Sequence, residues 1–275
     1  MTKALVLGGG GVTGIAWHLG LLCGLRRAGV PIGDADTIVG TSAGAVVGTL
    51  LATGVDLEAA VVAQEQQIDA TPPRPAGTTG RLARLAVLMD TSIPAQQARA
   101  KVGTMALAAA TQDEPSWLAR IGTLLPVTEW PARDLRLVVV DTADGRDVVL
   151  DAASGAPLLS AVAASCAVPG LMPPVTIDGR RYMDGGVRLG AGADLAAGAD
   201  RLVVVAPMAM LSRDRIVEEM AATGAARTLL IEPDQGSLEA FGPNFMDRSR
   251  RPASVRAGLR QGAELASAVR EVWSA

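Results

Sequence analysis

Residues 3–53 read KALVLGGGGVTGIAWHLGLLCGLRRAGVPIGDADTIVGTSAGAVVGTLLAT. Two short runs rich in aliphatic and β-branched residues, at 5–7 and 36–39, each end in a turn of small residues. Apolar residues then recur at helical spacing over 14–28, and a helix of small residues fits 43–53. A strand–turn–helix unit that occurs twice in succession is typical of a parallel sheet covered by helices. The sequence therefore predicts an α/β fold with a mostly parallel central sheet.

The chain of 275 residues has enough apolar side chains to bury a large core. Hydrophobic residues make up 49% and aromatic residues only 3%, so Val, Leu, Ile and Ala must fill that core. This content excludes intrinsic disorder. The net charge is −3 and the Lys and Arg residues form no cluster, so the sequence lacks the basic surface of a nucleic-acid-binding protein.

Beyond residue 53 the chain mixes helical and strand patterns. Helices are expected at 56–70, 81–89, 95–110, 115–125, 157–167, 213–223 and 253–272, with a loop at 71–80. Strands are expected at 136–141, 146–150, 175–177, 181–183, 202–206 and 228–231. Residues 56–134 show no strand pattern and are expected to form a helical insertion, either a lid or lipid-facing cap or ordinary crossover packing. Neither a repeat nor a linker divides the chain, so we expect one domain over residues 1–275.

The segment Gly40-Thr-Ser42-Ala-Gly44 has the pattern G-x-S-x-G. Between a strand and a helix this pattern forms a nucleophile elbow, a turn so sharp that only small residues fit two positions before and after the serine. The Ser42 hydroxyl then stands above the sheet at the N-terminus of the next helix. About 0.15 matches are expected by chance in this composition, and the flanking strand and helix make this one more specific. Ser42 is therefore the candidate nucleophile, with Gly40 and Gly44 as elbow glycines.

The glycine-rich segment Gly9-Gly10-Gly11-Val12-Thr13-Gly14 has two physical uses. It fits G-x-G-x-x-G after a strand, and Asp34 and Asp36 follow about 20 residues on, which is typical of dinucleotide binding. The backbone N–H groups of its first three glycines can instead converge at a helix N-terminus as an oxyanion hole. The neighbouring elbow favours the oxyanion hole. A dinucleotide-binding oxidoreductase that uses Gly9–Gly14 is the alternative.

A serine nucleophile needs a general base, and the chain contains one histidine, His18. No histidine follows Ser42, so the order Ser, Asp/Glu, His of the α/β-hydrolases is excluded. We expect His18, in the first helix, to be a packing or surface residue. Asp184 follows a short strand and precedes two glycines that leave space around it. A carboxylate is a weak base in water, so Asp184 must lie close to Ser42 and be partly desolvated to act.

At these residues the sequence resembles the patatin-like phospholipase family. The family is marked by a glycine-rich oxyanion loop, a G-x-S-x-G elbow, a Pro-bearing segment and an Asp-Gly-Gly motif, in that order. Here these marks stand at Gly9–Gly14, Gly40–Gly44, Ala164–Pro169 with Pro173-Pro174, and Asp184–Gly186. The resemblance extends over about residues 3–206.

The resemblance implies a three-layer α/β/α fold and a Ser42–Asp184 dyad that works without histidine, metal or cofactor. It also implies hydrolysis of lipid acyl esters, as by a phospholipase A, a lysophospholipase or an esterase, through a covalent acyl-enzyme. The backbone of Gly9, Gly10 and Gly11 would form the oxyanion hole. Two departures favour a further alternative, a lipid-binding relative of weak activity. Thr13 stands where the family usually carries Arg or Lys, and residues 187–192 lack the Asn that commonly follows Asp-Gly-Gly.

The remaining features concern the location of the protein. The chain begins directly with a strand and no apolar run reaches about 18 residues, so we expect neither a signal peptide nor a membrane-spanning helix. Cys23 and Cys166 lie in apolar, helix-like segments and are expected to be buried free thiols. We therefore expect a cytoplasmic protein without metal or cofactor, which binds a lipid or acyl-ester substrate, contacts a membrane surface transiently and does not bind nucleic acid.

Overall fold

A computed structural model describes residues 1–66 and 78–274 of the chain. Its centre is an eight-stranded sheet in the order β5-β6-β3-β2-β1-β7-β8, with β4 paired to β3. Strands β3, β2, β1, β7 and β8 are parallel to one another. Strands β4 and β6 are antiparallel to β3, and β5 is antiparallel to β6. The mostly parallel sheet predicted from the sequence is confirmed.

The strands are β1 (Lys3–Leu7), β2 (Thr37–Gly40), β3 (Asp134–Asp141), β4 (Asp147–Leu150), β5 (Val175–Ile177), β6 (Arg180–Asp184), β7 (Arg201–Val205) and β8 (Arg227–Ile231). The described helices are α1 (Gly11–Arg27), α2 (Ala43–Ala52), α3 (Leu57–Gln66), α4 (Thr78–Leu88), α5 (Ala95–Ala108), α6 (Glu114–Gly122), α7 (Leu158–Ser165), α8 (Arg213–Ala222), α9 (Gln235–Phe241) and α10 (Arg251–Trp273). Two short 3-10 turns matter below, η3 (Gly185–Arg188) and η4 (Ala193–Ala196).

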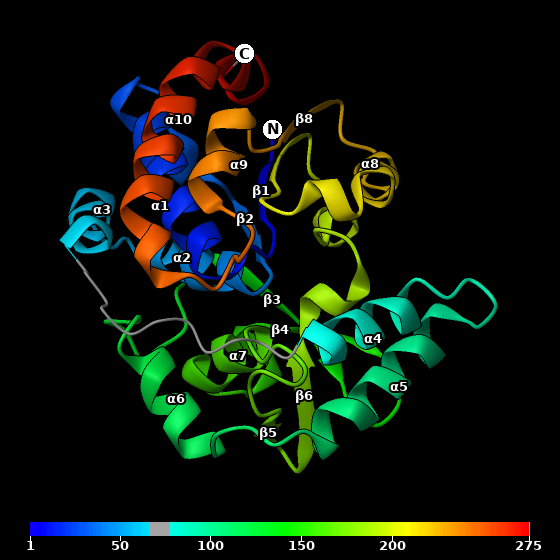
Figure 1. Cartoon of the computed structure of the whole chain (residues 1–275). Coiled ribbons are helices and arrows are strands. Elements are labelled where there is room, and N and C mark those ends of the chain that lie inside the picture. The colour runs from blue at the N-terminus through cyan, green and yellow to red at the C-terminus, as the bar shows by residue number, and fades with distance from the viewer. Residues whose placement is uncertain (67–77, 275) are drawn as a thin grey trace.

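Helices cover both faces of the sheet (Figure 1). Successive side chains of a strand point to opposite faces. On β1, Leu5 and Leu7 join the core cluster that contains residues of α1, α2, α7 and α10. Ala4 and Val6 join the cluster formed with η4 and α8 on the other face. The chain therefore has the three-layer α/β/α fold that the family resemblance implies.

Helices α1 and α10 pack closely enough that glycines are required between them. A Cβ atom on Gly20 or Gly24 of α1 would overlap the backbone of Val255 or Leu259 in α10. A Cβ atom on Gly258 of α10 would in turn overlap the backbone of α1 at Trp17. This contact fixes α1 against α10, which in turn packs on β7 and β8, and the N-terminus of α1 carries the glycine-rich loop.

Strands β2 and β6 end against the same edge of β3. Along β3, Leu137 pairs with Gly40 at the end of β2, and Val139 pairs with Asp184 at the end of β6. The opposite edge of β3 pairs with β4 over residues 137–140, so β2 and β6 must share the remaining edge. Because β2 and β6 run in opposite directions, their carboxyl ends meet on either side of Val138.

The predicted helical insertion contains no strand within its described residues, 56–66 and 78–133. Helix α3 packs on α1 and α10, and α5 packs on β3, so both behave as crossover helices. Helix α4 packs beside α5 (Figure 1), and Leu82 on it is 61% exposed. One boundary is corrected, because α4 begins at Thr78 inside the loop predicted at 71–80. Residues 67–77, which include the rest of that loop and the end of the helix predicted at 56–70, lie outside the described residues.

Helix α9 was not predicted from the sequence. It is only seven residues long, and Asp234 caps its N-terminus, because the Asp234 carboxylate accepts a hydrogen bond from the Ser237 N–H at 2.8 Å. The prediction of buried free thiols at Cys23 and Cys166 is confirmed. Among the described residues, no helix is both long and apolar enough to cross a membrane.

Candidate active site

Ser42 lies in the sharp turn between β2 and α2, in the position that the elbow motif predicts. Its backbone has φ 53° and ψ −115°, a strained conformation for a residue with a side chain. A Cβ atom on Gly44 would overlap the Leu7 carbonyl, and one on Gly40 would lie 2.7 Å from the Ala45 Cα atom. Both elbow glycines are therefore required by close backbone contacts. The Ser42 side chain is nearly buried, with 8% of the residue exposed.

A buried serine holds this strained turn in place. The Ser165 hydroxyl, at the end of α7, accepts a hydrogen bond from the Ser42 N–H at 3.0 Å and donates one to the Val138 carbonyl at 2.8 Å. The Cys166 thiol lies 3.2 Å from the Ser42 carbonyl oxygen, to which it donates. The end of α7 thus satisfies both backbone groups of Ser42 and occupies the gap at Val138 where β2 and β6 meet.

Asp184 lies at the end of β6, on the other side of Val138 from the elbow. It is 5% exposed, and its Oδ1 atom accepts a hydrogen bond from the Gly186 N–H at 2.7 Å. Burial raises the pKa of the Asp184 carboxyl to about 6, against the hydrogen bonds from Gly186 and from the Ser42 side chain, which lower it. Ser42 and Asp184, 142 residues apart in the chain, therefore come together in the structure.

The glycine-rich loop runs beside Ser42. A Cβ atom on Gly9 would lie 3.6 Å from the Ser42 Cβ atom. Gly10 caps the N-terminus of α1, and Gly11 has φ 60° and faces the Phe245 carbonyl. Within the described part of the chain, the N–H groups of these three glycines have no acceptor. They lie at the positive end of the α1 dipole, where a negative oxygen is stabilised.

His18 is a packing residue, as one of the two predictions for it stated. It is fully buried, and its Nε2 atom lies 3.0 Å from the Gly8 carbonyl, to which it donates. Burial lowers the pKa of His18 to about 4, so the ring is neutral at pH 7. His18 supports the start of the glycine-rich loop and does not contact Ser42 in the described hydrogen bonds.

The acidic residues of the dinucleotide alternative lie at the wrong end of the sheet. Asp34 and Asp36 precede β2, so they lie at its amino end, whereas the glycine-rich loop follows the carboxyl end of β1. Asp36 accepts a hydrogen bond from the Lys3 N–H, and Asp34 forms an ion pair with the Lys3 ammonium at 2.9 Å. Neither carboxylate can reach a ribose bound at the loop.

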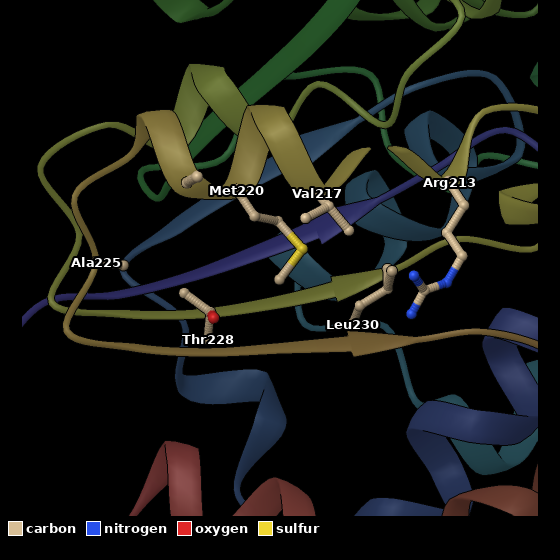
Figure 2. Close-up of a pocket in the computed structure, with 7 residues that line it drawn as sticks. Arg213, Val217, Met220, Ala225, Thr228 and Leu230 are labelled. Atoms are coloured by element: carbon tan, nitrogen blue, oxygen red, sulfur yellow. The ribbon is translucent and has the colours of Figure 1, made fainter. Parts of the chain in front are cut away.

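Two further features bear on ligand binding. A shallow groove lies between α8 and the edge strand β8 (Figure 2), which is separated from β2 by β1 and β7, and it contains none of the candidate site residues. Residues 1–66 and 78–274 hold no group of three or more His, Cys, Asp or Glu side chains placed to bind a metal ion. The candidate site is therefore the cluster of Ser42, Asp184 and the glycine-rich loop.

The family model described as Patatin-like phospholipase matches residues 5–197. This match covers more than half of the chain, so the chain belongs to the patatin-like phospholipase family. It includes all of the candidate site residues and ends before β7.

Individual proteins with some similarity to the chain include one curated relative and two solved structures. A segment of 53 residues is 51% identical to Lysophospholipase NTE1 of Coccidioides immitis (strain RS), and it spans 19% of this chain and 3% of that protein. VipD from Legionella pneumophila has 15% identity and a TM-score of 0.48, with 97% of this chain and 67% of VipD covered. ExoU, a type III effector protein of Pseudomonas aeruginosa, has 19% identity and a TM-score of 0.41. That alignment covers 95% of this chain and 53% of ExoU.

The motifs give Ser165 no role of its own, although the family resemblance includes it within the Pro-bearing segment. Its position could not be inferred, because its two partners lie 123 and 27 residues away in the chain. A small polar residue between Ala164 and Cys166, in an otherwise apolar helix end, was the available signal. A buried hydroxyl in such a place must find hydrogen-bond partners.

Replacing Ser165 by Ala is expected to lower both stability and the activity proposed below. The change leaves the Ser42 N–H and the Val138 carbonyl without partners in a buried place, at about 1–3 kcal/mol of unfolding free energy. It also frees the elbow, so we expect kcat to fall by about tenfold or more. Thermal denaturation and kcat measure the two effects. Ser160→Ala, on the same helix but half-buried and outside the site, should change kcat less than twofold, and equal losses in both variants would contradict the assigned role.

Proposed function

We propose that the chain is a serine acyl hydrolase that cleaves acyl esters of lipids through a Ser42–Asp184 dyad. Membership of the patatin-like phospholipase family supports the lipid class of substrate. The observation that carries the mechanism is the meeting of Ser42 with a buried carboxyl whose pKa is raised to about 6. A base with a pKa near the working pH combines the ionised state with useful basicity.

In the acylation step, the Ser42 Oγ atom attacks the ester carbonyl carbon while its proton passes to the Asp184 carboxylate. The carbonyl oxygen becomes negative in the tetrahedral intermediate, and the N–H groups of Gly9, Gly10 and Gly11 stabilise it. The intermediate collapses as the bond to the leaving alcohol breaks. Asp184 returns its proton to the alcohol oxygen, and the acyl group stays on Ser42 as an ester.

In the deacylation step, water attacks the acyl carbonyl and gives one proton to Asp184. The same three N–H groups stabilise the second tetrahedral intermediate. The bond to Ser42 Oγ then breaks, the serine oxygen takes the proton from Asp184, and the fatty acid leaves. No histidine is needed, because one carboxylate serves as base and then as acid in each half of the reaction.

The buried Thr13, which stands where the family usually carries Arg or Lys, makes backbone and side-chain contacts of its own. Its N–H donates to the Phe245 carbonyl at 3.1 Å, and its hydroxyl lies 3.4 Å from the same oxygen. The loop is therefore tied to the segment before α10 without a basic residue at position 13. This contact favours a rigid oxyanion hole, and with it an active hydrolase, over the alternative of a lipid-binding relative of weak activity.

A substrate panel tests the proposed function. The purified chain is incubated with a diacyl phospholipid, a lysophospholipid, a triacylglycerol and a p-nitrophenyl ester of the same acyl chain, with and without a calcium chelator. We expect fatty-acid release from at least one lipid, unchanged by the chelator, and covalent labelling by a fluorophosphonate probe. Absence of both release and labelling, together with a rise in melting temperature on addition of NAD, would support the dinucleotide alternative instead.

A further inference from the structure

A buried carboxylate outside the dyad binds three consecutive backbone N–H groups. Glu219 on α8 is 4% exposed, and its Oε2 atom accepts hydrogen bonds from Ala191, Gly192 and Ala193 at 3.0, 2.8 and 3.1 Å. Hydrogen bonds to an ionised acceptor are about twice as strong as those between neutral groups. A buried negative charge with this many donors fixes the backbone that supplies them.

The small residues of this segment fit around the carboxylate. A Cβ atom on Gly190 would overlap the Glu219 Oε1 atom. The Nε atom of the Arg215 guanidinium lies 3.6 Å from the same Oε1 atom. Position 190 therefore has no room for a Cβ atom while the Glu219 carboxylate occupies this place.

This segment connects the proposed base to the proposed oxyanion hole. After Asp184 the chain forms η3, passes through Leu189 at φ 56°, and reaches Gly190. The Ala191 Cβ atom then lies 3.8 Å from the Cβ position of Gly8, the residue before the glycine-rich loop. Movement of the segment would thus disturb both ends of the site.

Ion pairs on the side of β4 also restrain the chain next to this segment. The Arg188 guanidinium is 6% exposed and forms ion pairs at 2.8 Å with Asp147 of β4 and with Asp194 of η4. Arg99 of α5 pairs with the same Asp147 at 2.6 Å. These ion pairs restrain η3, whereas the hydrogen bonds to Glu219 restrain the residues after it. The two sets of contacts therefore act on different residues.

We propose that Glu219 is a positioning residue that holds the segment from Gly190 to Ala193, which follows Asp184 and η3, against the glycine-rich loop. The inference rests on the proposed function, because its effect is on that reaction. Glu219 lies beyond residue 197, where the family match ends. It reaches the site from a part of the chain that the shared motifs do not include.

The test compares Glu219→Gln with Glu218→Gln, which removes the same charge from the adjacent, exposed position of α8. Fluorophosphonate titration counts the competent sites, and kcat is expressed per titrated site so that unfolded protein does not contribute. For Glu219→Gln we expect kcat to fall about 10–100-fold with KM within about twofold, since the reacting groups shift while the binding surface stays. The acid limb of the kcat profile should also move, because the surroundings of Asp184 change. Glu218→Gln should match the wild type.

A second variant keeps the charge. Gly190→Ala places a Cβ atom against the Glu219 carboxylate and should reduce kcat in the same way, and it carries the test if Glu219→Gln does not fold. Wild-type kcat and acid limb per titrated site in either folded variant would overturn the inference while leaving the proposed function intact. A wild-type chain that neither hydrolyses lipid nor is labelled at Ser42 would instead overturn the proposed function, and the inference with it.

Discussion

Ser42→Ala is expected to reduce hydrolysis by about 10⁴–10⁶-fold and to remove fluorophosphonate labelling. Without the Ser42 Oγ atom no acyl-enzyme can form, and the remaining groups can only polarise the ester for attack by water. The substitution removes one nearly buried hydroxyl and keeps the backbone restraint from Ser165, so the fold should persist. Hydrolysis of a p-nitrophenyl ester and intact-mass detection of the probe adduct measure the two effects.

The strained backbone of Ser42 provides a control. Ser42→Gly should be as inactive as Ser42→Ala but more stable than it by about 1 kcal/mol, because glycine adopts φ 53° without strain. Thermal melts of the two variants check this difference. Full labelling of either variant would show that another residue reacts with the probe, and the assignment of Ser42 as nucleophile would then fail.

The first 53 residues predict most of the sheet centre, because local pattern and local turn chemistry act together there. Strands at 5–7 and 36–39 and helices at 14–28 and 43–53 were placed within about three residues of β1, β2, α1 and α2. Helix α9 could not be predicted in this way. It is short, contains Gly236, and depends on Trp17, whose indole donates to the Ser237 hydroxyl at 3.1 Å from a helix more than 200 residues away.

The candidate site also contains some residues that local motifs predict and others that only contacts in the folded chain reveal. Ser42 and Asp184 follow from motifs, because an elbow and an Asp-Gly-Gly turn have local requirements. Their meeting depends on the register of β2 and β6 along β3, which no local pattern specifies. Ser165 and Glu219 act through contacts between distant segments, and the raised pKa of Asp184 depends on burial. None of these could be derived from the order of residues alone.

Asp184→Asn should remove the proposed base and lower kcat by about 10²–10⁴-fold. The amide oxygen can still accept the hydrogen bond from Gly186, so the loop should keep its course. In the wild type, kcat should fall as the pH drops below about 6, since protonated Asp184 cannot accept the proton of Ser42. Steady-state rates from pH 4.5 to 8.5 measure both effects. A variant with wild-type kcat, or a wild-type profile without a limb near pH 6, would contradict the assignment of Asp184 as base.

The same substitution should stabilise the protein above pH 6. The pKa of Asp184 is near 3.8 in the unfolded chain and about 6 in the folded one, so the folded state binds the proton more tightly. This contribution to stability is fully present below pH 3.8 and is lost as the pH rises through 6, at a cost that approaches about 3 kcal/mol for the wild type. The neutral amide avoids that cost, so the variant should unfold at a higher temperature than the wild type at pH 8 and show no such gain at pH 4.

His18 changes stability over the same range with the opposite sign, which is why the comparison must be made at matched pH. Its pKa is lowered from 6.5 to about 4, so its contribution is present above pH 6.5 and is lost as the pH falls through 4. Both proteins carry His18 in the same surroundings, and the difference between their melting temperatures at each pH cancels its effect. That difference should grow between pH 4 and pH 6 and then level off. A difference that does not change with pH would mean that Asp184 ionises at its ordinary pKa in the folded chain, and the carboxylate would then be too weak a base for the mechanism.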